Sequence, residues 1–194
     1  RWIVDFNGYC AGSLISSEIV VTTAMCCLMQ RSNYAFVGGF SKRKSGLRRT
    51  VAERKIRPAF DQSRVRNDIC LVRLAAPVPF GPNIQPVCLP SSSLTINQGT
   101  LLHIAGWGSQ SVSSGLSKYL RSATLPTIPF SACSSQYQAL GLELDKRSHV
   151  CVRYIAYFTQ TNEFFILLYF FSLAAVSFSL LDTYFISYFF SSNT

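Results

Sequence analysis

Apolar and polar residues alternate in short runs along the first three quarters of the chain. These runs are rich in β-branched and aromatic residues, and Gly, Pro, Ser and Asn occupy most of the gaps between them. The runs that predict strands lie at residues 2–6, 10–16, 19–23, 34–39, 49–56 and 68–74, and then at 101–108, 118–128 and 148–152. Short strands with frequent turns predict an all-β sandwich or barrel, and a proline-rich segment at residues 76–93 predicts two lobes.

The hydrophobic pattern changes after Cys151. Residues 154–194 contain no Lys or Arg, and residues 164–181 form an 18-residue apolar stretch that only serines interrupt. Three interpretations of the tail at residues 152–194 stay open. It is long enough for a membrane anchor, although it has no basic flank and no aromatic belts. It is also consistent with a hydrophobic core segment, or with translated non-coding or misframed sequence, because Phe, Leu, Ile, Tyr and Ser have thymine-rich codons.

The net charge of +9 is concentrated in one part of the chain. Residues 42–57 contain the basic side chains Lys42, Arg43, Lys44, Arg48, Arg49, Arg54, Lys55 and Arg57, with Glu53 as the one acid. The run is either a solvated loop and strand edge or a site for an anionic partner, such as a sulfated glycan or an acidic protein. No aromatic residue lies between the charges to stack on bases, so we expect no nucleic-acid partner.

The cysteines predict a disulfide framework. Seven cysteines occur without a CxxC pair and with only two histidines, which argues against zinc and for an oxidising, extracellular location. Because the count is odd, one thiol has no partner within the chain.

Four motifs occur in the order and spacing of a known family. They are CAGSLISSEIVVTTAMCC (10–27), RNDICLVRL (66–74), IQPVCLP (84–90) and AGWG (105–108). Over residues 2–151 the chain resembles the chymotrypsin-like (trypsin-like) serine proteases. The resemblance implies two six-stranded antiparallel β-barrel lobes within residues 1–151. The first lobe would span about residues 1–75, and the second, at about residues 94–151, would be incomplete and followed by the atypical hydrophobic tail.

In that family a serine attacks the scissile carbonyl, a histidine accepts its proton, and a buried aspartate orients the histidine. The motifs place Asp68 at the aspartate position and Met25 at the histidine position. A thioether has no proton to exchange near neutral pH, so Met25 cannot act as a general base. We expect His103 and His149 to be surface or core histidines that do not face Asp68.

The family's Gly-Asp-Ser-Gly-Gly-Pro motif, which supplies the nucleophile and the oxyanion hole, does not occur in residues 1–194. The resemblance therefore implies a serine endopeptidase family member that is inactive. The alternatives are an extracellular binding module and a truncated product without function. Asp68 would be either a relic of the triad or a carboxylate that bonds local backbone amides, and Met25 would fill the vacated space.

The resemblance also implies disulfides. Cys10 with Cys26 and Cys133 with Cys151 match family pairs, and Cys27 with Cys70 can bridge if Met25 and Asp68 adjoin. Cys88 remains; in many family members this position is tethered to a propeptide or light chain, so we expect a free or intermolecular thiol. The basic run resembles a family loop that binds calcium in some members, but its single acid is a poor cage. We expect no metal ion and no cofactor.

Overall fold

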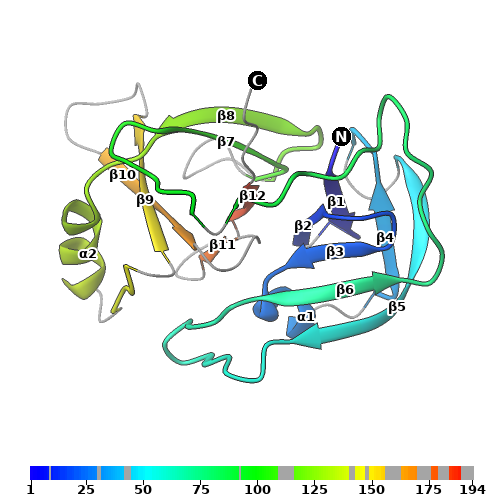
Figure 1. The fold of residues 1–194 in the computed structure, drawn as a ribbon, viewed down its shortest axis with the longest axis horizontal. Coiled ribbons are helices and arrows are strands. Elements are labelled where there is room, and N and C mark those ends of the chain that lie inside the picture. Colours follow the sequence, from blue (N-terminus) through cyan, green and yellow to red (C-terminus); the bar gives the residue numbers. More distant parts are fainter. Residues whose placement is uncertain are drawn as a thin grey trace.

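The computed structural model describes residues 1–8, 10–29, 32–41, 45–91, 93–108, 116–139, 143–146, 149–155, 163–169, 176–178 and 184–188. Figure 1 shows two lobes side by side, with the long segment between β6 and β7 passing from one to the other. The predicted two-lobed, mostly β architecture is confirmed in these residues.

The first lobe is a closed antiparallel barrel with the strand order β1-β2-β3-β6-β5-β4. Its strands are β1 (Ile3–Phe6), β2 (Cys10–Leu14), β3 (Ile19–Thr22), β4 (Tyr34–Val37), β5 (Leu47–Ile56) and β6 (Cys70–Leu74). Asn7 and Gly8 turn the chain between β1 and β2, and both have positive φ angles, of 55° and 79°. The barrel closes where β1 pairs with β4 in the register Val4↔Val37.

The strands fill the barrel with apolar side chains: every position of β1 and β2 is buried, and β6 alternates between buried and exposed positions. The largest buried members are Val4, Phe6, Leu14, Val20, Val37, Val72 and Leu74. Gly12 is required by close packing, since a Cβ there would lie 2.7 Å from the Val20 side chain and 2.9 Å from that of Phe6. The interior is therefore a packed core that fixes the ends of β2, β3 and β6.

The second lobe is not closed among its described strands. A four-stranded sheet has the order β11-β12-β7-β8, and β9 pairs with β10 in a separate two-stranded sheet. The elements are β7 (Leu101–Gly106), β8 (Arg121–Pro126), α2 (Phe130–Ala139), β9 (His149–Ile155), β10 (Glu163–Tyr169), β11 (Val176–Phe178) and β12 (Tyr184–Tyr188). The predicted incompleteness of this lobe is confirmed for the described part of the chain.

The tail contributes strands wherever the structure describes it. The backbone of β10 pairs with β9 from Glu163↔Ile155 to Tyr169↔His149, and β12 pairs with the edge of β7. The helix considered for residues 164–181 is therefore replaced by strand at 164–169 and 176–178. Within the described residues, no helix has both the length and the apolar character needed to cross a membrane.

Two short helices escaped the sequence analysis, and α1 (Ala24–Met29) is the one that bears on function. It follows β3 directly, because Thr23 Oγ1 accepts a hydrogen bond of 2.9 Å from the Cys26 N–H and caps the helix N-terminus. The β-rich run at 19–23 thus leads into one and a half turns of helix that carry Met25.

Candidate functional site

Met25 and Asp68 come together at one end of the first barrel. Met25 lies in the first turn of α1, and Asp68 lies two residues before β6, which pairs with β3 in the register Thr22↔Cys70. Because α1 follows β3 immediately, this register brings the two residues together across 43 positions of sequence.

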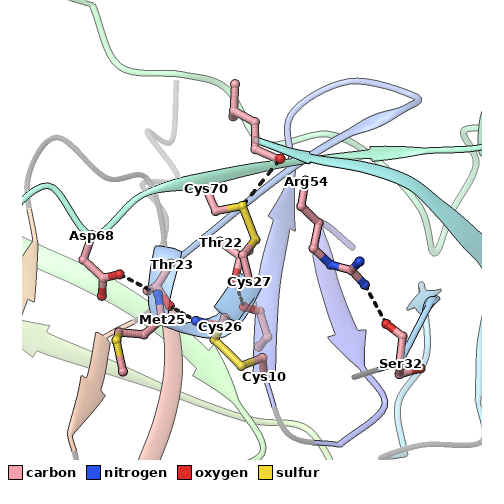
Figure 2. Close-up of a disulfide and its surroundings, with 12 residues drawn as sticks. Cys10, Thr22, Thr23, Met25, Cys26, Cys27, Ser32, Arg54, Asp68 and Cys70 are labelled. Atoms are coloured by element: carbon pink, nitrogen blue, oxygen red, sulfur yellow. Dashed lines mark hydrogen bonds between the residues drawn. A yellow bond between two sulfur atoms is a disulfide. The ribbon is translucent and has the colours of Figure 1, made fainter. Parts of the chain in front are cut away.

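The carboxylate of Asp68 bonds the backbone of α1. Its Oδ1 accepts a hydrogen bond of 2.9 Å from the Met25 N–H, and the dashed line in Figure 2 ends on that main-chain nitrogen. Asp68 is only 1% exposed. Burial raises the pKa of this carboxyl to about 6, and the Met25 and Ala24 amides act in the opposite direction. The geometry is that of a carboxylate held at a helix N-terminus, with no imidazole at the Met25 position.

Two disulfides tether α1 at the two residues that follow Met25. The Cys10–Cys26 bridge joins the helix to β2, and the Cys27–Cys70 bridge joins it to β6. The Cα atoms are 5.9 Å and 6.5 Å apart respectively, within the usual range for disulfides. All four cysteines are buried (Figure 2). The bridges hold α1 against β2 and β6 next to the Met25–Asp68 contact.

Neither histidine bonds to Asp68. His103 lies on β7, is exposed, and its Nδ1 is 2.8 Å from Thr124 Oγ1. His149 lies on β9, is 3% exposed, and its Nδ1 is 2.8 Å from the Asp145 carbonyl oxygen. Burial lowers the pKa of His149. Both histidines belong to the second lobe, and the positive charge of Arg66 from the first lobe also contributes to the lowered pKa of His149.

The basic run is described only in part. Lys42, Arg43 and Lys44 lie outside the described residues. The guanidinium of Arg48 is 4.7 Å from the centre of the Tyr34 ring, and Arg49 donates hydrogen bonds of 3.2 Å and 3.0 Å to the Pro77 carbonyl. Both arginines are thus fixed by neutral groups rather than by carboxylates.

The remaining cysteines form one further disulfide and one free thiol. Cys133 of α2 is bonded to Cys151 of β9, and the Cys88 thiol is free and exposed. No group of His, Cys, Asp and Glu in the described residues is arranged to hold a metal ion.

A known family model matches most of the chain. The Trypsin family model matches residues 1–162. The chain belongs to the trypsin family. The family resemblance predicted from the four motifs is confirmed, and the match continues beyond Cys151 to residue 162, past the end of β9.

Two relatives in this family are 30% and 28% identical to the chain over the aligned residues. It is similar to Trypsin 5G1 of Aedes aegypti, with 30% identity over 144 residues, which cover 74% of this chain and 54% of that protein. It is also similar to Clotting factor C of Tachypleus tridentatus, with 28% identity over 163 residues, which cover 74% of this chain and 16% of that protein. The chain thus spans about half the length of the Aedes trypsin and far less of the clotting factor.

A solved structure supports the fold of this trypsin-family chain. The protein of "Structure of GrC" superposes with a TM-score of 0.66 at 25% identity, over 74% of this chain and 62% of the other. The two-lobed arrangement is therefore the family's fold.

Sequence reasoning missed one pairing near the site. Arg66, two residues before Asp68, forms an ion pair with Glu143 of the second lobe. The "RNDI" string contains this arginine, but only the arrangement of the lobes reveals its partner 77 residues away.

Proposed function

We propose that this chain is a trypsin-family domain that does not hydrolyse peptide bonds. The observation that carries the proposal is the Met25–Asp68 contact: the orienting carboxylate is bonded to a main-chain N–H at 2.9 Å, and a thioether occupies the position of the general base. A hydroxyl nucleophile needs a neighbouring base to lose its proton near neutral pH. Without an imidazole at the Met25 position, Asp68 cannot orient a general base as the aspartate of a triad does.

A covalent probe tests this proposal directly. The full chain is incubated with a fluorophosphonate, which phosphonylates activated serines, beside an active trypsin as the positive control. We expect no labelling of the chain under conditions that label the trypsin completely. Time-dependent labelling at a single serine would contradict the proposal, because it requires an activated hydroxyl.

A binding role is the second part of the proposal. The fold is retained around a disulfide-linked barrel, and a disulfide framework is typical of secreted proteins, which favours an extracellular location. Arg48 and Arg49 make no ion pair within the described residues, which include only the pairs Arg64–Asp61, Arg66–Glu143 and Arg73–Glu53. Guanidinium groups held in place without a carboxylate favour an anionic protein or glycan as the partner.

A further inference from the structure

The turn at residues 61–67 is tied together by its own hydrogen bonds. The backbones of Asp61 and Arg66 exchange two hydrogen bonds, of 2.9 Å and 3.0 Å. The Asp61 carboxylate also accepts hydrogen bonds from the Ser63 amide at 3.0 Å and the Ser63 hydroxyl at 2.7 Å. The turn is therefore a defined structure that projects from the first lobe, between β5 and β6 (Figure 1).

Arg66 lies between two residues with left-handed backbone. Val65 has a φ of 50° and Asn67 a φ of 56°. Asn tolerates this region, and the Asn67 side chain donates a hydrogen bond of 2.8 Å to the Ala59 carbonyl. A β-branched residue such as Val65 rarely adopts it and does so only where the surrounding structure requires it. The strained backbone fixes the direction in which the Arg66 side chain leaves the turn.

That side chain crosses the boundary between the lobes. Arg66 Nη2 lies 2.7 Å from Glu143 Oε2, and Glu143 belongs to the second lobe, between α2 and β9. Among the described residues this is the one ion pair that joins the lobes, since Arg64–Asp61 and Arg73–Glu53 both lie within the first.

Other described contacts between the lobes are hydrogen bonds and packing between neutral groups, and Arg66 also acts electrostatically on His149 of the second lobe. The Phe40 carbonyl accepts hydrogen bonds from the Leu120 N–H at 2.8 Å and the Trp107 indole N–H at 3.3 Å. Trp107 also packs against the buried Ile3 and Ala11 of the first lobe. Salt should therefore weaken the Arg66–Glu143 pair and leave the hydrogen bonds to Phe40 and the packing of Trp107 in place.

We propose that the 61–67 turn is a latch between the lobes: the left-handed backbone at Val65 directs Arg66 to Glu143, and this pair holds the second lobe against the loop that carries Asp68. The latch does not depend on the proposed lack of activity. It assigns a role to a strained turn that neither the barrel core nor the Met25–Asp68 contact explains.

A double-mutant cycle on the full chain tests the latch. Hydrogen–deuterium exchange is followed at residues 61–68 and 143–146 in the parent, Arg66→Met, Glu143→Gln and the double variant. Partly exposed ion pairs of this kind correspond to about a 1.4- to 5-fold change in an opening equilibrium. We expect each single variant to speed exchange in both segments by that factor, the double variant to be no faster than either, and 1 M salt to reduce the difference.

Two further variants keep the test decisive. Arg64→Met removes an ion pair within the same turn and should leave exchange at residues 143–146 unchanged. The exchanged pair Arg66→Glu with Glu143→Arg should restore much of the protection. Additive effects of the single variants, or faster exchange confined to the segment that carries each substitution, would overturn the proposal.

Discussion

The side chain of Asp68 accepts a hydrogen bond of 2.9 Å from the backbone N–H of Met25. Asp68 therefore holds the N-terminus of α1, and this contact explains why a buried carboxylate is compatible with the fold although no histidine faces it. It also makes the stability of the first lobe depend on the protonation of Asp68.

Stability should fall as pH rises through the titration of Asp68. Its pKa in the folded chain is about 6, above the ordinary 3.8, so the unfolded chain releases this proton first. The contribution is complete below pH 3.8 and is lost as pH rises to about 6, with a total of about 3 kcal/mol. Asp68→Asn keeps an acceptor for the Met25 N–H and should remove this slope. Urea unfolding of the parent and of Asp68→Asn between pH 4 and pH 8 measures the free energy of unfolding of each.

Asp68→Ala is the matched control for that experiment. It also removes the titration, but it leaves the Met25 N–H without its acceptor, which costs about 1–3 kcal/mol for a buried group. We expect Asp68→Ala to be less stable than Asp68→Asn at every pH. Equal stability of the two variants would show that the hydrogen bond to Met25 contributes nothing.

His149 should produce the opposite slope. Burial lowers its pKa below the ordinary 6.5, so the unfolded chain binds a proton first as pH falls. Its contribution is complete above pH 6.5 and is lost on acidification. His149→Gln should therefore flatten the acid side of the stability curve. The effect is best measured in the Asp68→Asn background, where the opposing titration is absent, and a curve unchanged by His149→Gln would refute it.

The two disulfides on α1 should differ in their contribution to stability. Cys27–Cys70 spans 43 positions and Cys10–Cys26 spans 16. In the chain-entropy description the longer loop contributes about 4 kcal/mol and the shorter about 3 kcal/mol. Replacing both members of one bridge by Ala, with unfolding followed by circular dichroism, gives the ranking. A larger loss for the shorter bridge would mean that local packing, not loop closure, dominates.

The anionic-partner proposal predicts a selective loss of binding. Replacing Arg48 and Arg49 together by Gln removes two guanidinium groups that no carboxylate neutralises in the described structure. We expect affinity for immobilised heparin, or for an acidic peptide, to fall by about 2- to 30-fold. Arg64→Gln together with Arg73→Gln is the matched control, because it removes the same number of charges from paired sites. An equal loss of affinity in the control would contradict the proposal, because it would show that only the net charge of the chain matters.

Local pattern was enough to predict most of the first barrel, because its strands are short apolar and β-branched runs bounded by turn residues. The predicted bounds differ from the observed ones by a few residues at most strands, for example at β4, β5 and β6, where turns and pairing, not propensity, end the strand. Helix α1 was missed because its residues are apolar and lack a helical period, and only the Thr23 cap reveals its start.

The site was predictable in part for a different reason. The motifs alone were enough to predict that Met25 and Asp68 lie together, since a family resemblance implies which distant segments are neighbours in the fold. The main-chain partner of Asp68 and the Arg66–Glu143 pair were not predictable, because both depend on how close two backbones or two lobes lie. The tail could not be assigned from composition, since apolar residues without a clear period fit a strand as well as a helix.

Hydrolysis by the Met25→His variant tests the central claim most directly. The full chain, this variant and Met25→His with Asp68→Asn are compared for cleavage of an activated ester, with an active trypsin as reference. We predict no burst and no turnover above the uncatalysed rate in any of the three, because a restored base has no activated serine to serve. Turnover in Met25→His that Asp68→Asn abolishes would contradict this account, since it would show a nucleophile positioned for a triad.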